Sequence, residues 1–253
     1  MINTPIIDFH AHGGSWGRYG VIDDPKFYIK MMDSAGIDKA CINSIFFSDA
    51  HWANNLVNDR FVTKFPDRFI GVAFVTPHYP EETIKELDRS FNELNFKFLK
   101  LYPLYYGQPS VSDGFQPIFE WANQKEIPIM CHGKDDIDAP GTTLIKKYEK
   151  FSKDYPKIKW VLAHAACGAD PDSVQTAKEL PNIWLETCGS PTLLHGISFA
   201  VNNGLADKIL FGSDMPLFDY RHQIAKVTTI DASEEDKKKI LGLNAIKLLG
   251  LEI

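Results

Sequence analysis

The chain has 253 residues, 44% of them hydrophobic and 24% charged, and its formal net charge is -6. This composition is typical of a folded protein with a sizeable core, and it excludes a mainly disordered chain. The charges form no basic stripe and no apolar run approaches about 18 residues, so we expect neither nucleic acid nor a membrane as a partner.

Eight short runs rich in Ile, Val, Leu and Phe recur about every 30 residues, and each has the length of a strand. In chain order they are PIIDF (5–9), KACIN (39–43), FIGVAF (69–74), FKFLKL (96–101), IPIMC (127–131), KWVLA (159–163), NIWLE (182–186) and KILFG (208–212). Their nearly continuous apolar character is expected of parallel strands that are covered on both faces.

The segments between these runs have amphipathic patterns of helical length. Examples are residues 80–94, 113–126 and 234–250, and several segments begin with Asp, Ser or Pro, which favour a helix start. Strand and helix alternating eight times predict a (β/α)8 barrel, the TIM-barrel fold of the α/β class, with residues 1–253 as a single domain. An open, doubly wound sheet is the alternative architecture.

Polar side chains gather at the ends of four of these runs, where a barrel of parallel strands forms a shared mouth. They are Asp8, His10 and His12 after the first run, His132 after the fifth, His164 after the sixth and Asp214 after the eighth. Strand alternation would place the three residues of the first run on one face. Each signal is weak alone, since a single histidine is more often a core residue and an aspartate often caps a helix. Their joint placement favours a metal site.

The motifs that carry these residues resemble those of the amidohydrolase superfamily. They are DFHAH after the first run, the histidines after the fifth and sixth, and FGSDMP after the eighth. The resemblance is to the branch of amidohydrolase-related, metal-dependent hydrolases and decarboxylases that includes aminocarboxymuconate-semialdehyde decarboxylase. The segment LGLNAIKLLGL (241–251) is similar to the closing helix of that branch, so the resemblance spans nearly the whole chain.

The resemblance implies one divalent metal held by His10, His12 and His132, with Asp214 as a ligand or near-ligand. His164 would stand beside the metal as an acid or base, and Asp214 would share this catalytic role. Three neutral imidazoles suit zinc, which we expect, with manganese or another divalent ion as the alternative. Zinc lowers the pKa of a bound water to about 7, so hydroxide would form at neutral pH.

Three further polar residues at strand ends have open roles. Lys100, after the fourth run, is a substrate contact, a solvated or structural lysine, or a carbamylated bridge between two metals, as in some superfamily members. Glu186, after the seventh run, is a pocket carboxylate or the acid of a helix start. Asp8 either orients a ligand histidine or shapes the end of its strand.

Loops at the mouth are expected to select the substrate. Trp16, Arg18 and Tyr102 are candidate substrate contacts, and Trp52 adds to an aromatic lining suited to a small, partly flat molecule. Arg18 and Lys134 either hold a substrate carboxylate or are surface charges. The pattern of aminocarboxymuconate-semialdehyde decarboxylase suggests an arginine after the second strand, where this chain reads NSIFFSD, and this departure weighs against decarboxylation.

We therefore expect hydrolysis of a small amide, lactone or ester by a metal-activated water at the C-terminal mouth of the barrel. Nonoxidative decarboxylation of a small carboxylic acid is the alternative, and a catalytically idle barrel that binds a small molecule is the third hypothesis. The resemblance makes a homodimer a candidate assembly.

The N-terminus has no recognisable secretory signal, and the four cysteines form no CxxC pair. They are Cys41, Cys131, Cys167 and Cys188, each in or just after an apolar run. We therefore expect a cytoplasmic protein with reduced core thiols.

Overall fold

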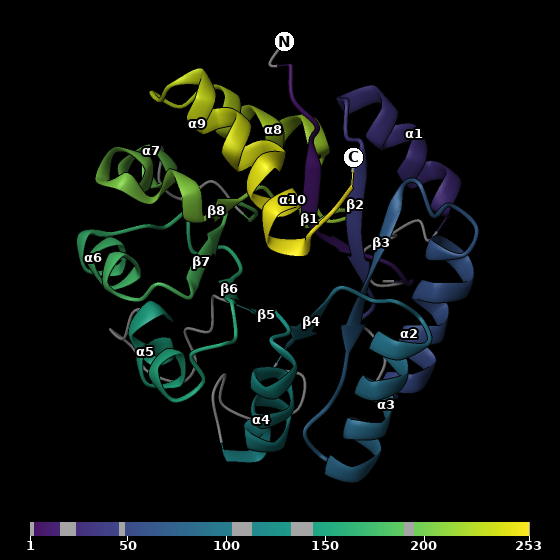
Figure 1. The fold of residues 1–253 in the computed structure, drawn as a ribbon. Coiled ribbons are helices and arrows are strands. Elements are labelled where there is room, and N and C mark those ends of the chain that lie inside the picture. The colour runs from purple at the N-terminus through teal and green to yellow at the C-terminus, as the bar shows by residue number, and fades with distance from the viewer. Residues whose placement is uncertain are drawn as a thin grey trace.

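Eight parallel strands form one sheet in the order β1 to β8 in the computed structural model of the chain (Figure 1). The structure describes residues 3–15, 24–45, 49–102, 113–132, 144–189 and 195–252. The strands are β1 (Ile7–His12), β2 (Lys39–Asn43), β3 (Phe69–Phe74), β4 (Phe98–Leu101), β5 (Ile129–Cys131), β6 (Trp160–Leu162), β7 (Ile183–Glu186) and β8 (Ile209–Leu210). Each strand falls on one of the apolar runs of the sequence, so the predicted strands are confirmed.

The segment that follows β8 closes the sheet against β1. The Phe9 N–H donates to Phe211 O at 2.9 Å, and the His12 N–H donates to Met215 O at 2.7 Å. An open, doubly wound sheet would reverse its strand order partway across, whereas here every strand pairs with its neighbour in sequence. The prediction of a TIM barrel is therefore confirmed, and the open-sheet alternative is wrong.

Helices surround the barrel (Figure 1). They are α1 (Pro25–Ala35), α2 (Ala50–Val57), α3 (Pro80–Asn92), α4 (Gln116–Lys125), α5 (Leu144–Asp154), α6 (Pro171–Glu179), α7 (Gly196–Ala200), α8 (Tyr220–Thr228), α9 (Glu234–Lys238) and α10 (Asn244–Leu249). Short π or 3-10 turns join some of them: η2 (Asn58–Val62), η4 (Asp113–Phe115), η5 (Val201–Leu205), η6 (Ala206–Lys208) and η7 (Lys239–Leu243). The helices expected over 80–94, 113–126 and 234–250 are present as α3, as η4 with α4, and as α9 to α10.

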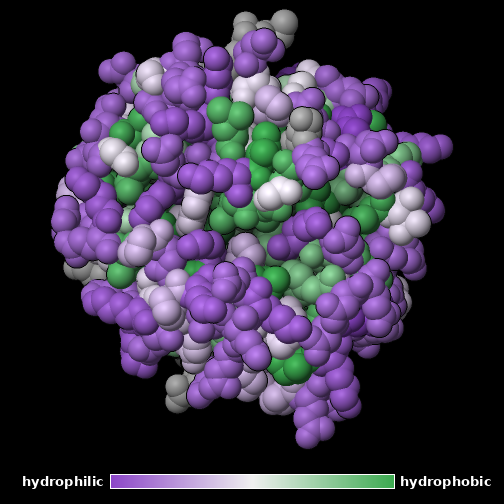
Figure 2. Space-filling view, in the orientation of Figure 1, coloured by the Kyte–Doolittle hydropathy of each residue, from purple (hydrophilic) through white to green (hydrophobic). Residues whose placement is uncertain are grey.

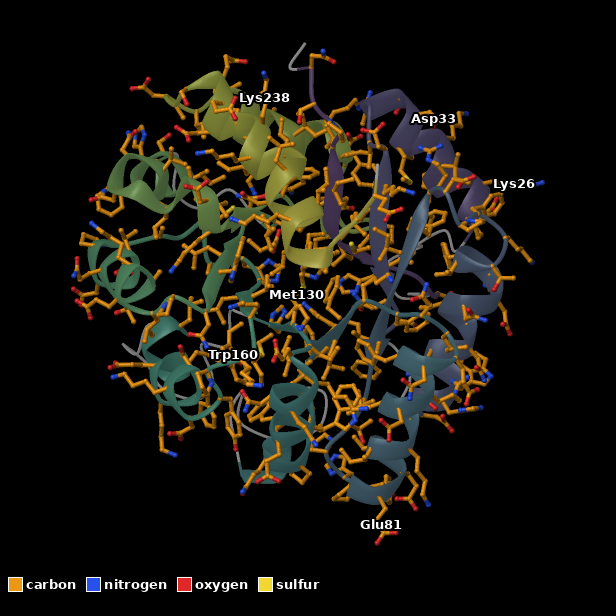
Figure 3. All side chains as sticks on the ribbon, in the orientation of Figure 1. Lys26, Asp33, Glu81, Met130, Trp160 and Lys238 are labelled. Carbon is orange, nitrogen blue, oxygen red and sulfur yellow. The ribbon has the colours of Figure 1, made fainter. Side chains whose placement is uncertain are left out.

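Apolar side chains cover both faces of the sheet. Inside the barrel, Phe9 stacks on Phe98 with ring centroids 4.3 Å apart, and Met130 lies near the barrel centre in Figure 3. Between the sheet and the helices, Trp160 packs edge-on against Phe119 at 5.0 Å. The labelled charged side chains in Figure 3 lie at the edge of the molecule. Burial on both faces explains why the strands are apolar along most of their length.

A β-bulge in β1 decides which of its polar residues face the mouth. The pairing with β2 shifts register between Asp8 and Ala11, so β1 has an extra residue there. Phe9 packs inside the barrel but Ala11 packs outside it, which reverses the alternation across the bulge. The prediction that Asp8 shares a face with His10 and His12 is therefore wrong.

Asp8 instead stabilises the bulge and the closure of the barrel. Its Oδ1 accepts from the His10 N–H at 3.0 Å and from the Ser213 N–H at 2.8 Å, while its Oδ2 accepts from Ser213 Oγ at 2.6 Å. Burial raises the pKa of Asp8 to about 7, although the hydrogen bonds from Ser213 oppose this rise. Of the two roles considered for Asp8, these contacts support that of shaping the strand end.

The helix α10 lies across the end of the barrel opposite the mouth. Ile246, Leu248 and Leu249 pack against the apolar layer inside the barrel. Figure 2 shows hydrophobic residues near the centre of this face, ringed by hydrophilic ones. This helix therefore covers the N-terminal end of the barrel, and the mouth is the opposite, C-terminal end of the strands. Within the described part of the chain, no helix combines the length and apolar character that crossing a bilayer requires.

A buried carboxylate joins α2, β3 and α3 outside the barrel. Glu86 accepts hydrogen bonds from Asn54 Nδ2 at 2.8 Å and from Arg89 Nη2 at 2.8 Å, and it lies 2.9 Å from His51 Nδ1. Asn54 in turn accepts from the Phe74 N–H at 2.9 Å. Burial opposes ionisation of Glu86, but these donors outweigh it and hold its pKa below the ordinary value of 4.5.

A Glu86→Gln variant is expected to lose about 1–3 kcal/mol of unfolding free energy at neutral pH, because an amide cannot accept from all of these donors. The folded-state pKa is depressed, so the carboxylate stabilises the fold above the ordinary value of 4.5, and this stabilisation disappears as the pH falls through the folded-state pKa. Urea unfolding should therefore show the gap between wild type and variant shrinking in acid. A difference in unfolding free energy that stays constant with pH would contradict the stabilising role of the ionised Glu86 side chain.

Candidate metal centre

Three ligand atoms converge at the mouth, from β1 and from the segment after β8. His10 Nε2 and His12 Nε2 lie 3.1 Å apart, and Asp214 Oδ1 lies 3.0 Å from His12 Nε2 and 3.6 Å from His10 Nε2. All three residues are buried. Atoms bound to one ion at about 2.1 Å, with angles of about 90° to 120° between them, lie about 3.0 to 3.6 Å apart, so this spacing fits a single divalent metal.

The hydrogen-bond partners of the His10 and His12 rings indicate which ring nitrogen carries the proton. His12 Nδ1 lies 2.9 Å from Asn43 Oδ1, and donation from Asn43 Nδ2 to Ala11 O at 3.2 Å orients that amide. His10 Nδ1 lies 3.3 Å from Glu186 Oε2. Because these oxygens only accept, each Nδ1 carries the proton and each Nε2 presents a lone pair. Lone pairs that converge beside a carboxylate oxygen favour a cation there; the amine of Lys100 reaches one of them, and a divalent metal fits all three atoms.

Lys100 of β4 reaches the same centre. Its Nζ lies 3.1 Å from His10 Nε2, and the whole side chain is buried. Burial lowers the pKa of this amine. Lys100 is therefore not a solvated surface lysine, and it places a group that can carry positive charge next to His10, at the candidate metal site.

His164 and His132 line the mouth beside this centre. The His164 ring lies 5.4 Å from the His10 ring and 4.8 Å from the His132 ring, measured between centroids. Tyr102 covers His132 with its ring 4.2 Å away. Among the described residues His132 belongs to neither compact set of metal-binding atoms, so its role as a ligand stays a prediction. The role of His164 as an acid or base likewise stays a prediction.

A second cluster of possible metal-binding atoms joins His10, His164 and Cys188. The Cys188 Sγ lies 3.0 Å from His10 Nδ1, 3.1 Å from His164 Nδ1 and 2.9 Å from Glu186 Oε2. The His10 atom of this cluster is Nδ1, which already faces Glu186. Hydrogen bonds therefore account for this cluster without a second metal.

The backbone of two residues of the site is left-handed. His164 has φ 67° and Asp214 has φ 61°, values that cost residues other than glycine about 1–2 kcal/mol each. Hydrogen bonds hold both: the His164 N–H donates to Glu186 Oε2 at 3.0 Å, and the Asp214 N–H donates to His10 O at 2.7 Å. Backbone strain of this kind concentrates at functional sites, where neighbouring contacts maintain it.

The protonation states of the site suit a metal. Burial, followed by the charge of Lys100, lowers the pKa of His10 to about 3, and burial also lowers the pKa of His164. Neutral imidazoles and an ionised carboxylate are the forms that bind metal ions.

The remaining predicted contacts lie at the rim or outside the described residues. Trp16, Arg18 and Lys134 are outside them, so these predictions stay untested. Tyr102 lies beside His132, as a residue of the mouth should, whereas Trp52 on α2 is 53% exposed.

Sequence reasoning missed two residues of the site. Asn43 was not considered, and Cys188 was grouped with the core thiols, which are all free and buried. Asn43 ends β2 and Cys188 follows β7, so both occupy strand-end positions of the kind that face the mouth. A search of those positions for neutral polar groups as well as charged ones would have found them.

Comparison with known proteins shows the family of this chain and proteins that are similar to it. A protein-family model described as amidohydrolase matches residues 7–251. Gamma-resorcylate decarboxylase of Polaromonas sp. strain JS666 is 23% identical over an alignment of 298 residues, which covers 92% of this chain and 90% of that protein.

Among solved structures, dihydroxybenzoic acid decarboxylase from Polaromonas sp. JS666, with bound manganese and the inhibitor 2-nitroresorcinol, matches with a TM-score of 0.74. It is 20% identical, and the match covers 98% of this chain and 97% of that one. 4-Oxalomesaconate hydratase from Rhodopseudomonas palustris matches with a TM-score of 0.73 and 22% identity, over 97% of this chain and 95% of that one. At these identities the solved structures show a shared fold.

Proposed function

Because the chain belongs to the amidohydrolase family, we propose that it is a metal-dependent decarboxylase that releases carbon dioxide from a small aromatic carboxylic acid. Two of the similar proteins are decarboxylases by name, and the solved one holds manganese. They support decarboxylation, the alternative of the sequence analysis, over hydrolysis, its first expectation. The proposal includes a divalent metal, zinc or manganese.

The observation that carries this proposal is the buried amine of Lys100 beside the metal position. A protonated Lys100, 3.1 Å from His10 Nε2 and beside a divalent ion, would favour a further anion in addition to Asp214. A carboxylic acid substrate brings that negative charge, whereas an amide, lactone or ester does not. A carbamylated Lys100 would supply a negative charge of its own, and a second metal per chain would reveal it.

The residues would then divide the reaction between them. When bound, the metal would draw electron density from the oxygen atoms of the substrate. Lys100 would pair with a carboxylate oxygen of the substrate. His164 would give a proton to the ring carbon that bears the carboxylate. The bond from that carbon to the carboxylate then breaks, its electron pair returns to the ring, and carbon dioxide leaves.

The low pKa of His164 fits this sequence of events. Burial keeps its ring neutral before substrate binds. A carboxylate bound nearby raises the pKa of a histidine. Substrate binding would therefore favour protonation of His164, and the reaction would use that proton. After each turnover the neutral ring is restored, ready for the next substrate.

Hydrolysis is the second candidate function, and the presence of both Asp214 and His164 at the mouth favours it. Either side chain can take a proton from an attacking water, as hydrolysis of an amide, lactone or ester requires. The hydratase among the similar structures is said by its name to add water, and its likeness to this chain extends to the fold.

The two functions are separated by their products. Purified protein with added manganese or zinc is incubated with hydroxylated benzoic acids, lactones and amides, and release of carbon dioxide is compared with release of acid. Carbon dioxide from a hydroxybenzoic acid is the expected result. Acid from a lactone, without carbon dioxide from any substrate, would overturn the proposal in favour of hydrolysis.

A Lys100→Met variant is expected to raise the KM for the acid at least about 30-fold, because losing one partner of a buried charge pair costs about 2–5 kcal/mol. The matched control is Lys208→Met, which removes a half-buried lysine that donates to Ala177 O and Leu180 O away from the mouth. Steady-state kinetics on both variants gives the comparison. An unchanged KM for Lys100→Met would remove this residue from substrate binding.

A further inference from the structure

A single carboxylate links a metal-binding histidine to the residue proposed as the acid. Glu186 ends β7 and is fully buried. Its Oε2 lies 3.3 Å from His10 Nδ1 and accepts from the His164 N–H at 3.0 Å. Cys188 supplies two further donors, its thiol to Oε2 at 2.9 Å and its backbone N–H to Oε1.

We propose that Glu186 is a positioning residue that fixes the tautomer of His10 for metal binding and the placement of His164 for proton transfer. This inference rests on the proposed metal-dependent function. Glu186 comes from the seventh strand, whereas the other residues of the site lie at the ends of strands one, two, four, five, six and eight.

The donors around Glu186 define its role. A buried carboxylate is costly unless donors surround it, and here both oxygens are engaged by His10, His164 and Cys188. With its acceptor positions occupied, Glu186 serves as an anchor rather than as a further metal ligand. By accepting from Nδ1 of His10, it leaves the Nε2 lone pair directed at His12 and Asp214.

Glycines make room for this arrangement. A methyl group at Gly212 would overlap Glu186 Oε1 and lie 2.9 Å from the Cβ of His10. A methyl group at Gly189, where φ is 108°, would lie 2.9 Å from His164 Nδ1. The backbone after β7 and β8 is therefore shaped around the carboxylate and the two rings that it holds.

The isosteric Glu186→Gln change should disrupt this arrangement in either orientation of the amide. If the amide oxygen faces His10 and His164, the NH2 group confronts the backbone N–H of Cys188. If the amide is reversed, the NH2 group faces the histidines, and His10 Nδ1 must become an acceptor. His10 would then carry its proton on Nε2 and could not bind the metal.

The test measures metal affinity and histidine tautomer in the whole protein. Competition with a chromophoric chelator gives the Kd for zinc and for manganese, and NMR of metal-free protein with isotope-labelled histidine identifies the protonated nitrogen of His10. Glu186→Gln is expected to weaken metal binding about 10–100-fold and to increase the population of the Nε2–H form of His10. At saturating metal, turnover should remain about 10-fold or more below wild type because His164 is displaced.

Glu86→Gln is the matched control, since it also neutralises a buried, hydrogen-bonded carboxylate but lies outside the barrel. It should lower thermal stability while leaving the metal Kd within about twofold of wild type. Wild-type affinity and an unchanged His10 tautomer in Glu186→Gln would overturn the inference.

The wild-type spectrum tests the inference even if Glu186→Gln does not fold. A proton on Nε2 of His10 in the metal-free wild type would overturn the assigned tautomer directly. Failure of wild type to bind zinc or manganese would instead overturn the proposed function, so the two failures are distinguishable.

Discussion

A His10→Ala variant is expected to lose its divalent metal and nearly all turnover. The substitution removes one of the three converging atoms that could bind an ion and leaves His12 and Asp214 of that group. Removing a residue that only supports a ligand costs about 10–100-fold in affinity or activity, so losing the ligand itself should cost at least about 100-fold. Elemental analysis of protein purified without chelators, together with steady-state kinetics, measures both effects.

The control for this variant is His222→Ala, which removes an exposed histidine of α8. It should keep the metal content and the turnover of wild type. Thermal unfolding of both variants shows whether any loss arises from the fold, since His10 is buried and its removal leaves a space. Full metal occupancy in His10→Ala would remove that residue from the ligand set.

An Asp214→Asn variant is expected to lower kcat by about a thousandfold while the barrel stays folded. The amide keeps the size of the side chain, and the backbone bond from the Asp214 N–H to His10 O at 2.7 Å is unaffected. The change removes the negative charge that faces His10 and His12, and with it a group able to accept a proton. General acid–base groups contribute about 100- to 10,000-fold, and loss of a charged metal ligand adds to this.

Asp207→Asn is the control, because that carboxylate is 70% exposed and pairs with Lys239 away from the mouth. It should leave kcat unchanged. Kinetics at several metal concentrations separates the two contributions of Asp214, since excess metal restores a weakened site but not a missing proton acceptor. An Asp214→Asn enzyme with wild-type kcat at saturating metal would confine the residue to a structural role.

These two variants test the parts of the site that the sequence already indicated. His10 and Asp214 are about 200 residues apart, and only the assumption of a closed barrel places them together. Because parallel strands direct their carboxyl ends to one mouth, strand-end positions could be compared before any coordinates were known. His164 and Tyr102 lie at the mouth for the same reason.

Other parts of the site depend on a local exception to regular structure. The alternation rule placed Asp8 beside His10 and His12, and the bulge in β1 shows that this rule fails there. A bulge depends on how β1 pairs with β2 and with the segment after β8, and its sequence alone reads as a regular strand. Asp8 consequently binds Ser213 and stabilises the closure of the barrel.

The sequence by itself determined the barrel and most of the candidate ligands. The spacing of apolar residues and the lengths of helices and strands are local properties, so they can be read without knowing the tertiary contacts. Only the tertiary structure decided that Lys100 is buried against His10 and that Glu186, Cys188 and Asn43 hold the rings. In each of these contacts, side-chain atoms of residues far apart in the sequence lie about 3 Å from one another. Whether such side chains meet depends on register, rotamer and the room left by glycines, which no periodic pattern encodes.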